Sequence, residues 1–304
     1  MGLAALFQAV LALASGGTPQ PTAVDGLSPR QKAALVVVSG LPAPRGVAGV
    51  LVQTWSRNEP RPRRALVFAD QEGGSASSFD DLPPSLPAAS IGSRGQAFAA
   101  GRATGRALGT AGVDVDLAPV LDLADGPLGS RQFSAPAYGI AFARGLAVGG
   151  TAACAKHFPG LGAAALSTDE SPHVHAGLPP AQLEAFRRAI RAGVSCVMVG
   201  HAFYNRFGAS RRASFSPAAY LLLRREGFDG VAITDSVSVF GSEWAVRAAR
   251  RAVLAGADLV LLTNGPDAAR VVRALVPLAR RGLLDEHVER VLAFRRSRGL
   301  PALP

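Results

Sequence analysis

Short apolar segments alternate with longer amphipathic segments through most of this chain. The apolar segments are rich in Val, Ile and Leu and lack a polar residue at every second position, which is typical of strands buried on both faces. They comprise residues 48–53, 65–69, 113–120, 151–155, 194–200, 231–234 and 257–262. The segments between them read as helices, among them residues 95–110, 180–192, 216–226 and 242–255.

This repeat of strand and helix favours a parallel sheet closed into a single-domain, TIM-like (β/α)8 barrel, with a doubly wound open sheet as the alternative. The chain has 304 residues, enough for one such domain. We expect the barrel over residues 27–304, with Ser28 and Pro29 opening its first helix.

Residues 1–26 are expected to form a signal-like or disordered tail. Residues 3–14 are apolar but too short to span a bilayer, and they resemble the core of an export signal, although the usual charged segment before it is missing. We therefore expect an exported protein, extracellular or in the cell envelope, with a cytoplasmic location as the alternative. No stable membrane insertion is expected, and the oligomeric state stays open.

The charge and cysteine patterns exclude two classes of site. The net charge of +10 comes almost entirely from arginines scattered along helix-like segments, without the basic block or interleaved aromatics of a nucleic-acid site. Attraction to anionic cell-envelope polymers is a further reading of this charge. Cys154 and Cys196 lie in apolar segments and are interpreted as small buried hydrophobic residues, so we expect no metal and no cofactor. His287, in a C-terminal helix-like segment, is expected at the surface.

Polar side chains follow several apolar segments at the point where each segment ends. Because the carboxyl ends of barrel strands face one mouth, such residues are expected to converge there although they are far apart in sequence. They are Asp70, Asp122, Lys156, His157, His201, Asp235, Thr263 and Asn264. For any one of them the alternative is a helix cap or a loop hydrogen bond, and we favour that reading for Asp122 and Asn264.

The string Lys-His-Phe-Pro-Gly-Leu-Gly at residues 156–162 favours a functional site over isolated caps and loop hydrogen bonds. It resembles the signature of the N-terminal barrel domain of glycoside hydrolase family 3, in particular of its β-N-acetylhexosaminidase branch. With gaps, the resemblance runs from about residue 27 to about residue 300. It implies a carbohydrate substrate and an enzyme that cleaves β-linked N-acetylhexosamine or a related sugar.

The resemblance also implies roles for individual residues. Asp70 begins Asp-Gln-Glu-Gly-Gly, which resembles the family segment whose aspartate binds sugar hydroxyls, but Ser78 stands where the family usually has an arginine. Asp235 matches the strand-end position of the family's nucleophile, which forms a glycosyl-enzyme intermediate. The remaining implied substrate-binding residues are Arg131, Lys156, His157 and His201.

The resemblance to the family is weakest at the residue that acts as the catalytic general acid and base. In the hexosaminidase branch an Asp-x-His on the loop after the signature acts as an aspartate-assisted histidine, and here Asp169 fits but Ser171 occupies the histidine position. We expect His173 to be the proton donor, because histidine titrates in the right range, with Asp169 orienting and charging its ring. His175 and Glu170 are weaker candidates.

Two hypotheses follow. The first is a retaining exo-glycosidase, an enzyme of carbohydrate metabolism with a role in cell-wall turnover. The second is a catalytically weakened barrel that binds glycans, motivated by Ser78 and Ser171 at two functional positions. Phosphorolysis at the same site stays open.

Overall fold

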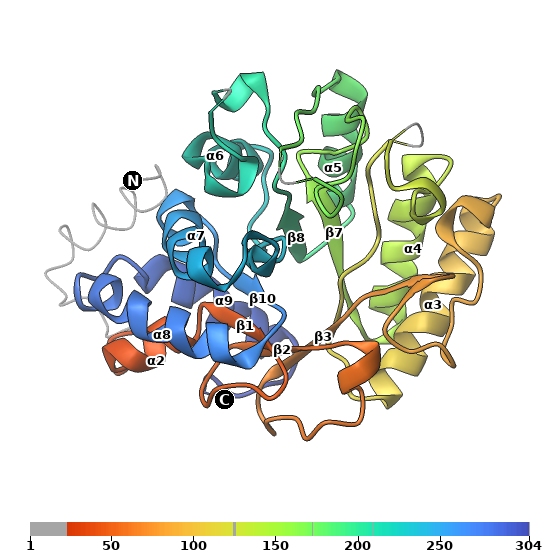
Figure 1. Cartoon of the computed structure of the whole chain (residues 1–304). Coiled ribbons are helices and arrows are strands. Elements are labelled where there is room, and N and C mark those ends of the chain that lie inside the picture. Colours follow the sequence, from red (N-terminus) through yellow and green to blue (C-terminus); the bar gives the residue numbers. More distant parts are fainter. Residues whose placement is uncertain (1–22, 124–125, 172, 209, 304) are drawn as a thin grey trace, which may run out of the picture.

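The computed structural model of the protein describes residues 23–123, 126–171, 173–208 and 210–303. Its main sheet has eight parallel strands in the order β10-β1-β2-β3-β6-β7-β8-β9 (Figure 1). A parallel bridge between Ile233 and Leu259 joins the two ends of this sheet into a nearly closed barrel. The strands are β1 Val37–Gly40, β2 Gly49–Val52, β3 Leu66–Ala69, β6 Val115–Asp116, β7 Ala152–Phe158, β8 Cys196–Val199, β9 Val231–Thr234 and β10 Val260–Leu262. The short strands β4 Gln71–Gly73 and β5 Ala76–Ser77 form a separate hairpin.

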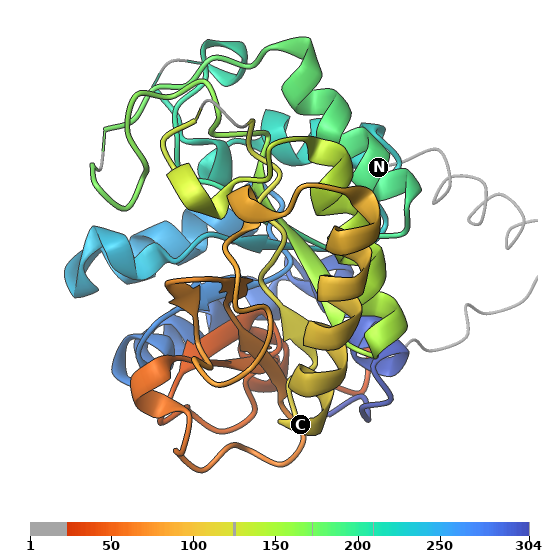
Figure 2. The ribbon, with the colours of Figure 1, turned by 90° about the vertical axis from the view of Figure 1, so that its right-hand side faces the viewer.

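Helices cover most sides of the barrel, as Figures 1 and 2 show. The α-helices are α2 Pro29–Ala34, α3 Arg94–Thr110, α4 Pro136–Gly149, α5 Pro180–Arg191, α6 Pro217–Arg225, α7 Ser242–Ala255, α8 Gly265–Arg280 and α9 Asp285–Ser297. Single 3-10 turns are η1 Thr54–Ser56, η2 Ala88–Ser90, η3 Gly129–Arg131, η4 Asn205–Phe207, η5 Ala213–Phe215 and η6 Val237–Phe240. The TIM-like barrel expected from the repeat is confirmed. It is irregular in its first two units, because residues 41–48 and 53–65, all of them described, contain no α-helix.

The strands are buried on both faces because their residues contribute alternately to two hydrophobic clusters. Val38, Leu51 and Phe68 belong to a cluster that fills the barrel. Their neighbours Val37 and Val50 belong to the cluster that packs against the helices. This double burial explains why the strand segments are continuously apolar in the sequence.

Three expectations at the level of single residues are corrected. Cys154 and Cys196 are not separate hydrophobic residues but a disulfide, because the parallel pairing of β7 with β8 sets them directly opposite each other. His287 is not at the surface: its side chain is 13% exposed, and its Nδ1 lies 3.1 Å from buried Asp258. Val24, within the segment expected to be a tail, is buried in the core, while residues 1–22 lie outside the described residues.

In the described part of the chain, no helix combines the length and the apolar character that crossing a membrane requires.

Candidate active site

A cavity of about 300 Å³ opens at the carboxyl ends of the barrel strands. Asp70 directly follows β3, Lys156 and His157 lie near the end of β7, and Asp235 directly follows β9. Because all these strands are parallel, their ends deliver the four side chains to the same mouth. The charged and titratable side chains that line the cavity are Asp70, Glu72, Arg131, Lys156, His157, Asp169 and Asp235.

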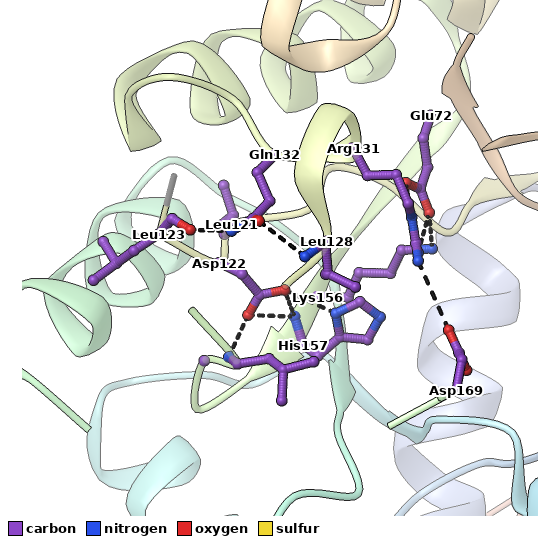
Figure 3. A network of polar contacts seen from close by, with 12 residues as sticks. Glu72, Leu121, Asp122, Leu123, Leu128, Arg131, Gln132, Lys156, His157 and Asp169 are labelled. Carbon is purple, nitrogen blue, oxygen red and sulfur yellow. Dashed lines mark hydrogen bonds and ion pairs between the residues drawn. The ribbon is translucent and has the colours of Figure 1, made fainter. Parts of the chain in front are cut away.

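Glu72 is the centre of an ion-pair network at the base of this cavity (Figure 3). Both of its carboxylate oxygens accept hydrogen bonds from Arg131, through Nε and Nη2, each at 2.8 Å. Nζ of Lys156 lies 2.7 Å from the Glu72 carboxylate and 2.6 Å from that of Asp70. Two cations thus fix the Glu72 side chain, and Lys156 bridges it to Asp70.

Opposite charges outweigh burial in setting the pKa values of this network. Burial acts to raise the pKa of Glu72, but the charges and hydrogen bonds of Lys156 and Arg131 bring it to about 2. Burial acts to lower the pKa of Lys156, but Asp70 and Glu72 raise it above its ordinary value. Glu72 and Lys156 are therefore both charged at neutral pH.

The structure explains why residue 160, within the signature string, is a glycine. Its φ is +132°, and a Cβ atom at this position would lie 1.9 Å from Cγ of Gln182. Gln182 in turn donates a hydrogen bond to the carbonyl of Leu121 and accepts one from the amide of Leu123. The close approach of Gly160 therefore lets Gln182 hold the segment that carries Asp122.

Asp235 is fixed at the end of β9 by backbone contacts. Its Oδ1 accepts a hydrogen bond from the amide of Ser236 at 2.8 Å. Burial acts to raise the pKa of Asp235, but the neighbouring histidines, the Ser236 amide and the Lys156 ammonium lower it by more. The result is a carboxylate that stays ionised at neutral pH, the state that a nucleophile or an electrostatic stabiliser requires.

Among its described residues, the loop of residues 167–175 contributes one side chain to the cavity. Asp169 lines the cavity, with Oδ2 3.8 Å from Nη1 of Arg131. His173 and His175 instead stack on Phe203, with ring centroids 6.3 and 5.0 Å from it, and neither lines the cavity. Glu170 accepts a hydrogen bond from the amide of Ser167.

His201 is buried behind the cavity wall rather than in its lining. Its Nε2 donates to the carbonyl of Ser236, and its Nδ1 accepts from the hydroxyl of Ser214. Burial lowers the pKa of this histidine. The ring therefore supports the segment after Asp235 in its neutral form.

The structure thus brings five of the substrate-binding and nucleophile residues expected from the sequence to one cavity, and their roles stay predictions. Sequence reasoning missed Glu72. For Asp122 the expected loop hydrogen bond is confirmed, because its carboxylate accepts from the backbone amide of Leu161, but its contact with the His157 ring was not foreseen. For Glu72 a signal existed, because Asp70 and Glu72 are two residues apart and an extended chain points such side chains the same way. Ser78, in the usual arginine position, lies in the cavity and accepts a hydrogen bond from the amide of Asp70.

Among the described residues, no group of three or more His, Cys, Asp or Glu side chains is arranged to hold a metal ion.

Comparison with known proteins agrees with the observed fold. The chain is 36% identical over 252 residues to a Beta-hexosaminidase of Thioalkalivibrio sulfidiphilus, which covers 71% of this chain and 70% of that relative. The structure of a glycosyl hydrolase of the GH3 family from Mycobacterium smegmatis aligns with a TM-score of 0.80 and 26% identity, covering 90% of this chain and 98% of the other. Beta-N-acetylhexosaminidase from Beutenbergia cavernae aligns with a TM-score of 0.76 and 27% identity, covering 88% and 98%.

The profile described as the glycosyl hydrolase family 3 N terminal domain matches residues 49–294, from the start of β2 into α9. This span contains all the charged and titratable side chains that line the cavity. The chain therefore belongs to glycosyl hydrolase family 3, as a glycoside hydrolase of the hexosaminidase-like kind.

Proposed function

We propose that this protein is a retaining exo-glycosidase that hydrolyses β-linked N-acetylhexosamine or a related β-glycoside. One observation carries the proposal: the ionised carboxylate of Asp235 faces the same small cavity as the hydroxyl-binding candidates Asp70 and Lys156. A cavity of about 300 Å³ suits one sugar ring, and a single ring at the end of a glycan is what an exo-acting enzyme accepts.

In the proposed reaction Asp235 attacks the anomeric carbon of the terminal sugar. A bond forms between its carboxylate oxygen and that carbon while the bond to the leaving oxygen breaks, and a donor on the loop of residues 167–175 protonates that oxygen. Water then attacks the anomeric carbon of the intermediate, giving its proton to the same loop group and releasing Asp235. Asp70, Lys156 and Arg131 hold the sugar hydroxyls in position during both steps.

The proton-transfer group is assigned to the loop of residues 167–175. Of the loop's four titratable candidates, Asp169 is the one that lines the cavity, whereas His173 must leave Phe203 to reach it. Lids and loops of this kind complete a catalytic site when substrate binds. Mutation can distinguish Asp169 from His173, because only loss of the true proton donor makes activity depend strongly on the leaving group.

The alternative function is a glycan-binding barrel with weakened catalysis. Two observations favour it: Ser78 occupies the position of an expected arginine, and both loop histidines lie outside the cavity. Phosphorolysis by the same residues also stays open, because inorganic phosphate could replace water in the second step.

We further propose that the protein acts outside the cytoplasm on cell-wall glycans. The disulfide between Cys154 and Cys196 supports this location, because disulfides persist mainly in oxidising compartments. The apolar segment near the N-terminus, which lies outside the described residues, is the second support.

A panel of nitrophenyl β-glycosides tests the proposal, with a 2-fluoro sugar as the mechanistic probe. We expect turnover of the N-acetylhexosamine substrate and a covalent adduct at Asp235, located by mass spectrometry of peptides. Turnover without an adduct would contradict the retaining mechanism. Binding of N-acetylhexosamine without turnover would favour the glycan-binding alternative, and a sugar phosphate formed in phosphate buffer would show phosphorolysis.

A further inference from the structure

A second cavity, of about 530 Å³, has a lining that shares no residue with that of the candidate active site. It is formed where the loop after β8 meets the N-terminus of α6 and the last turns of α7. Three arginines line it, Arg211, Arg212 and Arg251, together with Phe203 and Phe215. No Asp or Glu is among the described residues of its lining.

The positive charge of this second cavity is not compensated within the described part of the chain. None of its three guanidiniums forms an ion pair with a described carboxylate, whereas Arg131, Arg187 and Arg224 each do. A cavity with three unpaired guanidiniums has the donors to bind a carboxylate or a phosphate.

Arg212 is held in place, so its charge has a fixed position. Its guanidinium lies 4.5 Å from the ring centroid of Phe203 and 4.8 Å from that of Phe240. Nη1 of Arg212 also donates a hydrogen bond to the carbonyl of His201. Arg211 and Arg251 are exposed beside it and can close on a ligand.

His201 contacts a lining residue of each cavity. The ring of His201 packs on Phe215 of the second cavity, with centroids 5.9 Å apart, and its Nε2 donates to the carbonyl of Ser236, which lines the first. The loop of residues 167–175 borders both, because Asp169 lines the first cavity and His175 stacks on Phe203 of the second.

The position of that loop decides which part of a substrate reaches the second cavity. In a retaining glycosidase the proton donor stands beside the leaving oxygen, so the leaving group lies on the donor's side of the cleaved bond. Here the proposed donor loop reaches from the sugar cavity, which Asp169 lines, to Phe203 of the second cavity, on which His175 stacks. The leaving part of a bound substrate is thereby directed toward the second cavity and its arginines.

We propose that the second cavity is a subsite for an anionic group, a carboxylate or a phosphate, on the leaving part of the substrate. This inference rests on the proposed function, since it uses the donor loop to orient the substrate. It makes the protein selective for acidic glycans through Arg211, Arg212 and Arg251, which are outside the sugar cavity.

Three disaccharides test the subsite. All begin with the same β-linked N-acetylhexosamine, and the second sugar carries a carboxamide, a carboxylate or a phosphate at one position. We expect wild-type kcat/KM to be about tenfold higher for one or both anionic substrates, mainly through KM, with the larger ratio identifying the anion. The preference should shrink with added salt, because salt screens exposed charges.

The variant pair Arg211→Ala with Arg251→Ala should lose the preference and keep its turnover of the neutral disaccharide. The pair Arg211→Lys with Arg251→Lys should retain part of it. Arg280→Ala with Arg281→Ala, at the exposed end of α8, makes the same change in net charge away from the cavity and should leave the preference intact. An equal preference in wild type and in the first pair, or an equal loss in the α8 pair, would overturn the subsite.

Failure of the proposed function would look different. If no disaccharide and no nitrophenyl glycoside is turned over, the enzyme assignment fails, and calorimetric binding of the two anionic disaccharides then decides the subsite. Binding that is lost with Arg211 and Arg251 would support it, and no difference between charged and neutral disaccharides would reject it.

Discussion

Asp122 fixes the imidazole of His157: its Oδ2 lies 2.8 Å from Nδ1, and the same carboxylate accepts the backbone amide of His157 (Figure 3). Because a carboxylate only accepts, Nδ1 carries a proton and Nε2 is the ring nitrogen available to a ligand in the cavity. Burial acts to lower the pKa of His157, but the hydrogen bond and charge of Asp122 outweigh burial and raise it.

Asp122→Asn should therefore lower the pKa of His157, because it removes the charge that opposes burial. We expect kcat/KM for N-acetylhexosamine substrates to fall by about tenfold, as for other residues that orient a ligand-binding histidine. NMR titration of the imidazole and steady-state kinetics measure the two effects. An unchanged titration midpoint would contradict this account of His157.

Asp235→Ala should reduce hydrolysis by at least about a thousandfold while the protein remains folded, because the variant has no nucleophile. Asp229→Ala is the matched control, since Asp229 is exposed just before the start of β9 and far from its active-site end. Rates with nitrophenyl glycosides, together with far-UV circular dichroism, measure the outcome. Near-normal turnover in the Asp235 variant would exclude its role.

Variants of the loop should identify the proton donor. Loss of the donor hurts poor leaving groups more than activated ones, so the correct variant loses far more activity on natural glycans than on nitrophenyl glycosides, and azide partly restores the latter. We expect this pattern for His173→Ala and a weaker one for Asp169→Ala. His175→Ala, which stacks on the same Phe203, is the control. The strong pattern in Asp169→Ala alone would make that carboxylate the donor.

Glu72→Gln should weaken both substrate binding and stability, because Lys156 and Arg131 lose the charge that holds them. The pKa of Glu72 falls from 4.5 to about 2 on folding, so its contribution to stability is complete above about pH 4.5 and is lost as the pH falls toward 2. Urea unfolding across this range should show a flatter acid dependence in the variant. Glu226→Gln, which breaks a pair with Arg187 on the helix surface, should show a smaller change.

Asp116→Asn should be tolerated and should stabilise the protein increasingly as the pH rises. Asp116 is fully buried, its Oδ1 accepts from the amide of Gln71, and its Oδ2 has no hydrogen-bond partner in the described structure. Burial raises the pKa of Asp116 well above its usual value. The wild type therefore loses stability as the pH rises from about 4 toward that raised pKa, and the asparagine variant does not.

Urea unfolding of wild type and Asp116→Asn at several pH values measures this difference. Asp116→Ala is the contrasting variant, because it removes the acceptor of the Gln71 amide and should destabilise at every pH. Parallel pH curves for wild type and Asp116→Asn would mean that Asp116 does not hold its proton as described.

Much of the barrel could be predicted because strands buried on both faces leave continuous apolar segments in the sequence. Strand β1 was harder, since Val37–Gly40 follows helix α2 within one long apolar segment that has no turn residue to divide it. The disulfide and the roles of Glu72 and Asp122 depend on strand register and on partners more than 30 residues away in sequence. Local pattern carries no information about such pairings, whereas the strand-end position of Asp235 does.

The sugar cavity has an electrostatic character opposite to that of the whole molecule. The chain carries a formal charge of +10, yet four carboxylates face the cavity against the two permanent cations Arg131 and Lys156. In the proposed reaction the sugar ring becomes oxocarbenium-like, so a locally negative field lowers the barrier in the place where positive charge develops. The same field repels acidic sugars such as uronic acids. We therefore expect the preferred substrate to have a neutral ring at the point of cleavage and negative groups that bind the surrounding basic surface.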